Sequence, residues 1–335
     1  MRPLKLGIFI KILVMLVLIG MLGANNSFAG IIKTYKVGKS PLAIAIDASG
    51  NVWVANSEAS YITKISEKNG KTIGKYYVGK DPIALSIDMQ NNVWVLLADS
   101  DSIIKLNGQT GNIIGKYHDR KWPDAIVADY SGNIWTTSLR SDIVTKLNCT
   151  TGSVLGIYHV GKGPGLMGLA VGKSGNIWVV NSDDNYITKI NGATGAIMAE
   201  YPLGKHPIAI AIDYKSNSVF IANSESKRIM KLDAKTGSII GDYPIKQGIY
   251  HRYPTSIAVD GAGNVWIVSI EGDRVFEMNG KTGVIMKEYR ISNWPANIAI
   301  DNKGDVWVTN NLSNTVTEIC KAATPVKTPL VLQIK

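Results

Sequence analysis

Six aspartates recur at one place in a repeated sequence, and carboxylates at regular spacing could ligate a metal ion. Each ends a short apolar run and is followed within a few residues by a tight turn such as Ala-Ser-Gly-Asn. An aspartate in this position accepts hydrogen bonds from the backbone of its own turn. Because the residue returns in nearly every copy, we interpret the set as turn caps and predict no metal site there: Asp47, Asp88, Asp129, Asp213, Asp260 and Asp301.

Basic residues stand two positions before the proline that opens most copies. They are Lys39, Lys80, Lys121, Lys205 and Arg252, with Lys162 slightly displaced in the fourth copy and Asn293 in the seventh. Acids such as Glu58 and Asp101 follow the second strand of several copies. The two sets could form surface ion pairs worth about 0 to 1 kcal/mol each. Alternatively, the cations form a funnel for an anionic ligand, because a cleft lined by one sign of charge focuses the field.

Aromatic and histidine side chains come directly before the same opening position. They are Trp122, His206, Tyr253 and Trp294, and His251 lies close by in the longest link. If these positions lie at the mouth of a channel, their side chains suit stacking against sugars or other rings. Alternatively, they pack against the rim of the channel, and both interpretations remain open. His118 and His159 end outer strands, where we expect a solvated surface role.

A repeat of 41 to 46 residues carries all of these positions. Seven copies are present, and an aromatic marks the middle of each: Trp53, Trp94, Trp135, Trp178, Phe220, Trp266 and Trp307. In the first copy the strand signals cover Ala43 to Asp47, Val52 to Ala55, Tyr61 to Ile65 and Thr72 to Val78. One such meander cannot bury both faces, so the sequence predicts an all-β, seven-bladed propeller of four-stranded antiparallel blades.

This fold places the first strand of each copy along a central channel. The link into each copy and the loop between its second and third strands then share one face, which we call the upper face. The basic and aromatic positions above gather there. The turn aspartates lie at the opposite, lower face.

The N-terminal strand predicts how the ring closes. Ile31 to Val37 resembles the fourth strand of the first copy, Thr72 to Val78, but has no first three strands before it. The seventh copy departs from the pattern after Ile319. We therefore expect the N-terminal strand to complete the seventh blade. The tail from Pro325 to Lys335 could instead be that fourth strand, or an extra cover on the rim. Cys149 and Cys320 fall in non-adjacent blades, so no disulfide is expected.

Residues 1–29 read as a secretory signal peptide, with a basic start, an apolar run and Ser-Phe-Ala before the predicted cleavage. An uncleaved anchor is the alternative. The expected domains are thus 1–29 signal peptide, 30–320 propeller and 321–335 tail. The full chain carries +10, and without Arg2, Lys5 and Lys11 it carries +7. We expect a monomer that is secreted, periplasmic or on the cell surface, has no membrane span in its mature part and does not bind nucleic acid.

The repeats resemble known propeller families. The run D-x-x-G-N-V-W-V-x-N, seen from Asp47 to Asn56, is similar to NHL repeats and to the streptogramin B (virginiamycin B) lyase type. The link V-G-K-x-P and the strand T-G-x-I-I-G-x-Y resemble YVTN surface-layer repeats. The resemblance covers nearly all of residues 31–320 and implies the same fold.

The lyase family also implies a chemistry that this chain does not match. That family eliminates across an ester of a cyclic peptide antibiotic, with Mg²⁺ and a histidine base just after the opening proline of late blades. The residues in that position here are Leu42, Ile83, Asp124, Met167, Ile208, Thr255 and Ala296. The family's glutamate just before such a proline is also missing.

Two functions remain open from the sequence. We favour a non-catalytic scaffold at the cell envelope, which would bind an anionic polymer, a small molecule or a protein partner and needs no cofactor. The alternative is a lyase-like or lactonase-like enzyme with Mg²⁺ or Ca²⁺ in the channel.

Overall fold

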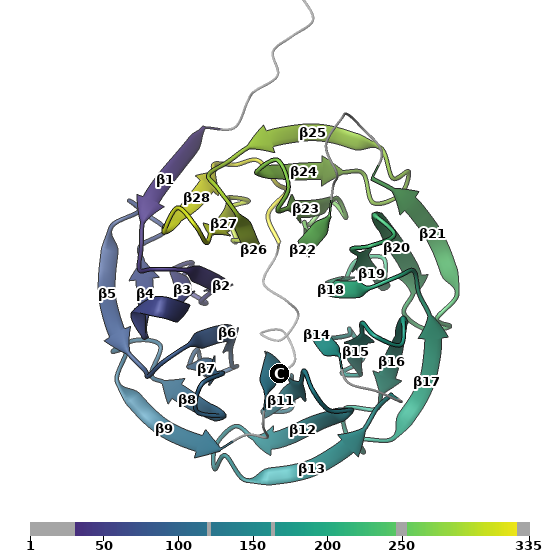
Figure 1. The fold of residues 1–335 in the computed structure, drawn as a ribbon, viewed down its shortest axis with the longest axis horizontal. Helices are drawn as coiled ribbons and strands as arrows, with labels where there is room; N and C mark the ends of the chain where they lie inside the picture. The colour runs from purple at the N-terminus through teal and green to yellow at the C-terminus, as the bar shows by residue number, and fades with distance from the viewer. Residues whose placement is uncertain (1–30, 119–121, 162–164, 246–252, 327–335) are drawn as a thin grey trace, which may run out of the picture. The chain divides into compact units, whose positions relative to one another are not determined.

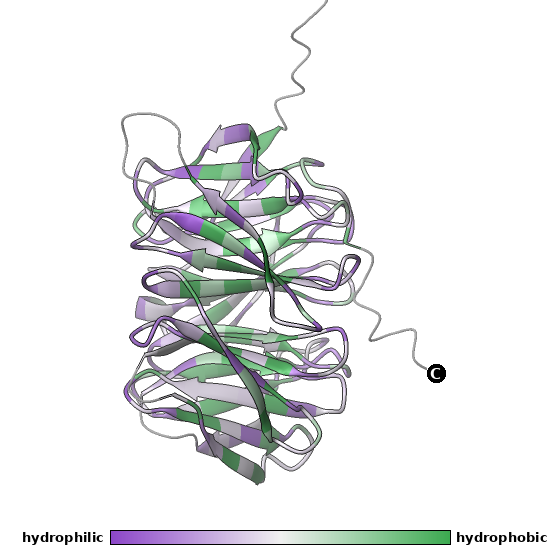
Figure 2. Cartoon of the chain, turned by 90° about the vertical axis from the view of Figure 1, so that its right-hand side faces the viewer, coloured by the Kyte–Doolittle hydropathy of each residue, from purple (hydrophilic) through white to green (hydrophobic). Residues whose placement is uncertain are grey.

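The computed structural model describes residues 31–118, 122–161, 165–245 and 253–326. Its described strands form seven four-stranded antiparallel sheets, arranged as blades around a central channel (Figure 1). Seen from the edge of the ring, hydrophilic residues gather in the turns of both faces (Figure 2). The predicted fold class is confirmed.

Each blade runs from an innermost to an outermost strand. The innermost strands are β2 (Pro41–Ile46), β6 (Pro82–Ile87), β10 (Pro123–Ala128), β14 (Leu166–Val171), β18 (Pro207–Asp213), β22 (Pro254–Val259) and β26 (Pro295–Ile300). The second strands are β3 (Val52–Asn56), β7 (Val93–Leu97), β11 (Asn133–Ser138), β15 (Ile177–Asn181), β19 (Ser218–Asn223), β23 (Val265–Ser269) and β27 (Val306–Asn310). The third strands are β4 (Tyr61–Ile65), β8 (Ser102–Leu106), β12 (Ile143–Asn148), β16 (Tyr186–Ile190), β20 (Arg228–Asp233), β24 (Arg274–Met278) and β28 (Thr315–Ile319). The outermost strands are β5 (Thr72–Tyr77), β9 (Ile113–His118), β13 (Val154–His159), β17 (Ile197–Pro202), β21 (Ile239–Pro244), β25 (Ile285–Arg290) and β1 (Ile32–Lys36).

The core lies between neighbouring blades. Second strands such as β3 are buried along their whole length, whereas outermost strands such as β5 alternate between exposed and half-buried residues. The central aromatics are 0 or 1 % exposed in all seven blades. Five of the tryptophans, including Trp53 and Trp94, stack on a tyrosine of the outermost strand at 5.4 to 5.7 Å between ring centroids. The central aromatics are therefore core residues, as predicted.

The N-terminal strand closes the ring. β1 pairs antiparallel with β28, from Ile32 opposite Ile319 to Lys36 opposite Thr315. Tyr35 stacks on Trp307 with 5.7 Å between ring centroids. The closure predicted from residues 31–37 is confirmed. β28 pairs with β27 on one side and with β1 on the other, so the tail does not take the place of the fourth strand.

The turn aspartates do more than cap their turns. Asp47 Oδ1 accepts bonds from the backbone N–H of Ser49 at 3.0 Å and Asn51 at 2.9 Å. Its other oxygen accepts the indole N–H of Trp53 at 3.0 Å. The same carboxylate–indole bond recurs in blades 2, 3, 6 and 7. Five of the six aspartates thus fix a turn and orient a core ring, whereas Asp213 of blade 5, where Phe220 replaces the tryptophan, only caps its turn.

Both cysteines, Cys149 and Cys320, are free thiols, as expected. Residues 1–30, which include the predicted signal peptide, lie outside the described residues. None of the described segments forms a helix long and apolar enough to cross a membrane.

Candidate functional site

The upper face is built from the links between blades and the loops that follow the second strands. In the first blade, the backbone N–H of Ser57 donates to the Ser40 carbonyl at 3.0 Å. The Ser40 N–H in turn donates to Asn314 Oδ1 of the seventh blade at 2.9 Å. Link and loop therefore share one face and join neighbouring blades, as the repeat predicted.

In blades 1, 2, 3, 5 and 7 the residue that precedes the innermost strand has a left-handed backbone. The φ angle is 63° at Trp122, 52° at His206 and 59° at Trp294. Residues other than glycine rarely adopt this conformation, so something must hold it. The N–H of Trp122 donates to Asp101 Oδ1 at 3.0 Å, and that of Trp294 donates to Asp273 Oδ1 at 2.8 Å.

These bonds decide the role of two loop acids. From the sequence, Asp101 was expected either to pair with the upper-face cations or to leave those cations free, and Asp273 was not singled out. Their carboxylates instead accept backbone N–H groups, as do the side-chain amides of Asn185 and Asn314 in the corresponding loops. The acids thus hold the linking residues in place.

The two tryptophans stand out from the surface. Trp122 is 50 % exposed and Trp294 is 48 % exposed. They lead into blades 3 and 7, which lie on opposite sides of the ring (Figure 1). Exposed indoles on a backbone that is held in place provide flat apolar surfaces for a ring-shaped or planar ligand group.

Two cations join this aromatic set and were missed in the sequence. The Arg140 guanidinium lies 3.9 Å from the centroid of the Trp122 ring, and Lys227 Nζ lies 4.6 Å from that of Tyr253. Both basic residues follow a second strand, in loops where the sequence analysis counted only acids. The sequence signal that could have identified them is a basic residue two to four positions after a second strand.

Three of the predicted cations, Lys39, Lys80 and Lys205, are exposed on the same face. Within the described part of the chain, none of these three lysines makes an ion pair. His206 and Tyr253 are half-buried beside them in the links. Lys121, His251 and Arg252 lie outside the described residues.

One acid lies on an innermost strand near the upper end of the channel. Asp124 follows Pro123 on β10 and is half-buried. Loss of solvent raises the pKa of its carboxyl to about 7. The matching positions in the other blades hold residues without a charge, from Leu42 to Ala296. Asp124 is therefore a single titratable group in an otherwise uncharged ring.

The two remaining histidines lie where they were predicted. His118 ends β9 and His159 ends β13, both outermost strands. His159 Nδ1 is 3.2 Å from Asp142 Oδ2 on the exposed surface. Neither histidine is on the channel side of its blade.

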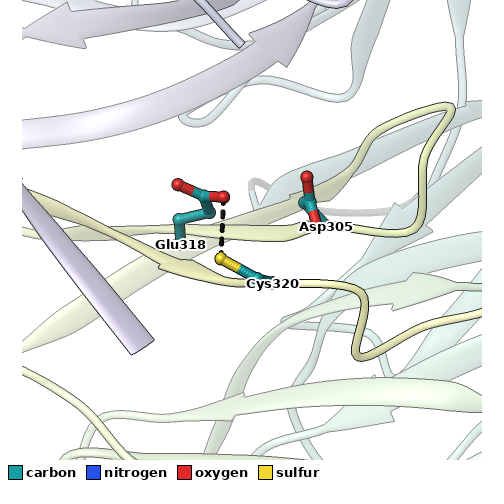
Figure 3. A group of neighbouring side chains, drawn as sticks. All are labelled: Asp305, Glu318 and Cys320. Carbon is teal, nitrogen blue, oxygen red and sulfur yellow. Dashed lines mark hydrogen bonds between the residues drawn. The ribbon is translucent and has the colours of Figure 1, made fainter. Parts of the chain in front are cut away.

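A cluster of three potential metal ligands lies away from this face, where β28 meets the last turn of blade 7. Asp305, Glu318 and Cys320 place ligand atoms within 4.8 Å of one another (Figure 3). The Cys320 thiol donates to Glu318 Oε1 at 2.9 Å, and the Lys33 ammonium reaches the same oxygen at 3.2 Å. Burial raises the pKa of Cys320 to about 11. A protonated thiol and a neighbouring ammonium fit a structural contact rather than a metal centre.

Comparison with known proteins identifies the family of the repeats. The model of the virginiamycin B lyase family matches residues 72–331. None of the curated proteins compared matches the chain. Among solved structures, a virginiamycin B lyase from Staphylococcus aureus is 18 % identical with a TM-score of 0.77, covering 87 % of this chain and 99 % of its own.

Two further structures share the fold. A streptogramin B lyase is 20 % identical with a TM-score of 0.77, over 86 % of this chain and 96 % of its own. A Kuenenia stuttgartiensis hydrazine synthase is 14 % identical with a TM-score of 0.77, over 86 % of this chain and 97 % of its own. At these identities the structural matches establish the propeller and no chemistry.

Proposed function

The chain belongs to the virginiamycin B lyase family, and we propose that it works within that fold as an exported, non-catalytic scaffold whose upper face binds an anionic polymer of the cell envelope. The observation that carries the proposal is the pair of exposed, conformationally fixed tryptophans, Trp122 and Trp294, on the face that also carries exposed cations. Aromatic planes bind sugar rings, and cations bind their acidic substituents.

The cations of this face support an anionic ligand. Lys39, Lys80 and Lys205 stand in equivalent links of three blades and are exposed. Arg140 adds a guanidinium against the Trp122 ring. Residues 30–335 carry a net charge of +7, obtained from +10 by removing the three basic residues of the first 29, which contain no acid. Long-range attraction and local contact therefore favour the same class of ligand.

The binding test removes charge from one face at a time. The variant Lys39→Gln, Lys80→Gln, Lys205→Gln should bind an immobilised acidic polysaccharide roughly tenfold more weakly at low salt, if each charge contributes about 0.5 kcal/mol. A matched control, Lys71→Gln, Lys235→Gln, Lys281→Gln, loses the same charge from exposed turns of the lower face. Equal retention of both variants would refute the upper-face assignment.

The aromatic contribution is tested separately. Trp122→Ala and Trp294→Ala should each weaken binding, because each removes a half-exposed ring without touching the core. Their unfolding curves should match that of the parent protein. If polysaccharide affinity is unchanged in the double variant, the face does not bind through its rings.

A lyase is the second candidate, and Asp124 is the observation that favours it. A carboxyl with a pKa of about 7 is suited to acid–base chemistry at neutral pH. Mg²⁺, however, prefers several oxygen ligands in octahedral geometry. Among the described residues, no group of three potential ligands gathers at Asp124. The residues present do not fit a protein-bound Mg²⁺ there.

The two candidates are separated by an activity test. Purified protein is incubated with a streptogramin B antibiotic and Mg²⁺, and ring opening is followed by mass spectrometry. The scaffold proposal expects intact antibiotic at the rate of the buffer blank. Ring opening that disappears in Asp124→Asn would establish the lyase instead.

A further inference from the structure

The outermost strands carry a ring of exposed aliphatic side chains at their lower ends. The two positions concerned lie four and three residues before the tyrosine of each outermost strand, such as Tyr76 of β5. Thirteen of these fourteen positions hold an apolar residue, and twelve of those residues are 42 to 69 % exposed. We call the twelve the lower rim: Ile31, Ile32, Ile73, Ile113, Ile114, Val154, Leu155, Ile197, Met198, Ile239, Ile240 and Met286.

The lower rim follows the circumference of the ring, next to the lower turns. In blade 1, the Gly70 N–H closes such a turn on the Ser66 carbonyl at 2.8 Å, and β5 begins at Thr72. The outermost strands surround the whole ring (Figure 1). Single exposed apolar residues are normal, but 12 of the 18 large apolar residues exposed in the described chain belong to this rim. Such a gathering indicates a contact surface.

The turns below the rim are basic. Eight of their lysines are exposed: Lys68, Lys71, Lys173, Lys215, Lys235, Lys281, Lys303 and Lys321. Of these eight, only Lys303 makes an ion pair within the described part of the chain, with Glu67. The acids of the same described turns are all buried or half-buried, as Asp47 and Asp233 are. The lower turns therefore present exposed positive charge without exposed carboxylates.

The upper face has a different charge pattern. Exposed acids stand among its lysines, for example Glu58, Asp99 and Glu225. Its exposed apolar residues are also fewer and stand apart, as Trp122 and Trp294 do. The combination of an apolar rim with one sign of charge is thus a property of the lower face.

An apolar rim around a basic face fits an anionic lipid surface. Lysines near such a surface are attracted to its headgroups. Interfacial elements bury their apolar side chains about 5 to 10 Å into the boundary between headgroups and acyl chains. Ile73 is three residues from the turn at Gly70, which is at most about 10 Å of extended chain. Polar turns among the headgroups would therefore place the rim at the acyl boundary.

The path of the chain favours the same partner. Ile31, the first described residue, belongs to the lower rim and is 69 % exposed. The apolar run from Ile12 to Leu22 precedes it in the sequence. If that run is retained as an anchor, which was the alternative to a cleaved signal peptide, it joins the propeller at the lower rim and not at the upper face.

We propose that the lower face is a membrane-contact surface, which binds anionic lipid headgroups through its lysines and the outer acyl region through the lower rim. This surface is independent of the upper-face function. It leaves the upper face directed away from the bilayer.

Cosedimentation with vesicles tests the rim. The protein from residue 30 onward contains all seven closed blades and lacks the apolar run, which would insert by itself. It should bind phosphatidylcholine vesicles that contain about 30 % phosphatidylglycerol at least about tenfold more tightly than pure phosphatidylcholine. Ile114→Ser, Ile240→Ser should weaken this binding about tenfold, because two half-exposed aliphatic side chains are lost. The control Tyr77→Ser, Leu312→Ser removes more exposed side chains from the upper ends and should bind like the parent.

The lysines are tested with the two charge variants designed for the upper face. Lys71→Gln, Lys235→Gln, Lys281→Gln should bind the anionic vesicles at least about tenfold more weakly and keep its affinity for acidic polysaccharide. Lys39→Gln, Lys80→Gln, Lys205→Gln should keep vesicle binding. The two ligands therefore report separately on the two faces, and failure of one proposal leaves the result for the other intact.

Two results would overturn the membrane assignment. One is a parent protein that does not bind the anionic vesicles, and the other is unchanged binding of Ile114→Ser, Ile240→Ser. Without vesicle binding, self-association of the parent in ultracentrifugation that is lost in the same variant would assign the rim to a second copy of the chain. Should that variant fail to fold, the lower-face lysine variant decides, since it changes only exposed side chains.

Discussion

Blades 1 to 5 differ from blades 6 and 7 in the charge of the third-strand residue that lies opposite the central aromatic. In the first five blades a lysine of the third strand lies opposite the central aromatic and donates to a turn carbonyl of the next blade. Lys64 Nζ, for example, lies 4.6 Å from the Trp53 ring centroid and 2.7 Å from the Gly108 carbonyl oxygen. We call the set bridging lysines: Lys64, Lys105, Lys146, Lys189 and Lys231.

Blades 6 and 7 carry Glu277 and Glu318 at the same register, opposite Trp266 and Trp307. A carboxylate cannot donate to the next blade. Glu277 instead faces Lys287 at 3.3 Å on the adjacent outermost strand. Glu318 receives Lys33 at 3.2 Å and the Tyr35 hydroxyl at 2.5 Å, both from β1.

The difference marks where the chain stops repeating. A bridging lysine needs the turn of a following blade, whereas Glu318 binds a strand supplied from the other end of the chain. The contact to the next blade is then made by a different pair, because Lys303 of blade 7 forms an ion pair with the buried Glu67 of blade 1. The charge at this position therefore changes sign at blades 6 and 7, and in blade 7 the acid accepts hydrogen bonds from the strand that closes the ring.

The closing blade should be the most sensitive to charge reversal. Glu318→Lys imitates an internal blade but places a second cation beside Lys33 and leaves the Tyr35 hydroxyl without its acceptor. We expect a loss of about 3 kcal/mol in the free energy of unfolding, because the buried Glu318 carboxylate loses two charge-assisted hydrogen bonds, one of them from the half-exposed Lys33. Denaturant unfolding followed by tryptophan fluorescence measures it. Adding Lys33→Glu should recover at least half, and a loss below about 1 kcal/mol would contradict the role given to Glu318.

Substitution of a bridging lysine in an internal blade should lower the free energy of unfolding by a smaller amount. Lys146→Met keeps an apolar stem over Trp135 but leaves the Gly192 carbonyl, which Lys146 reaches at 2.7 Å, without its donor. The expected cost is about 2 kcal/mol, the penalty of one buried unsatisfied acceptor and a lost cation–π contact. Lys116→Met, on an exposed position of β9, should change stability by less than about 0.5 kcal/mol. Equal effects of the two substitutions would argue against a bridging role.

The ionised Glu277 carboxylate should lower the free energy of unfolding at neutral pH. Burial raises the pKa of its carboxyl above 4.5, so the folded state holds the proton more tightly than the unfolded state does. Stability due to this group is greatest below the unfolded pKa and falls as pH rises through the folded pKa. Glu277→Gln should therefore stabilise the protein at pH 7, and this gain should disappear at pH 4, where Glu277 is protonated in the folded state. Unfolding curves at both pH values test this, and a stabilisation that is the same at pH 4 would refute it.

The smallest effect is expected for metals at the closing blade. Because Lys33 already supplies positive charge to Glu318, adding Zn²⁺ or removing metals with EDTA should shift the unfolding midpoint by less than about 1 °C. Thermal unfolding monitored by circular dichroism is sufficient. A shift of 5 °C or more on adding Zn²⁺, absent in Cys320→Ser, would make Asp305, Glu318 and Cys320 a metal centre.

The repeat predicted the fold almost completely. Periodic tryptophans, turn glycines and the orphan strand at Ile31 to Val37 are local signals, and each reports on a contact that recurs in every blade. The turn role of Asp47 and its equivalents was predicted as well. Their bonds to the indole N–H groups were not, because the side chains involved are six residues apart and meet only after the hairpin has formed.

The upper-face geometry was less predictable. Asp101 was expected to be a partner for lysines and Asp273 was not singled out, yet both hold the backbone of a tryptophan twenty-one residues away, Trp122 and Trp294. Arg140 and Trp122 meet because a loop folds back over a link, which no local pattern encodes.

The pairing of Ile32 with Ile319 has a consequence for how the protein is made. These residues are 287 positions apart, so the seventh sheet cannot be completed until nearly the whole polypeptide has left the ribosome. Joining such distant partners carries the largest loop-closure entropy in the molecule and is expected to come late in folding. Until then Trp307 lacks the Tyr35 ring on which it stacks. The nascent molecule is an open arc in which the edge of β28 has no partner strand.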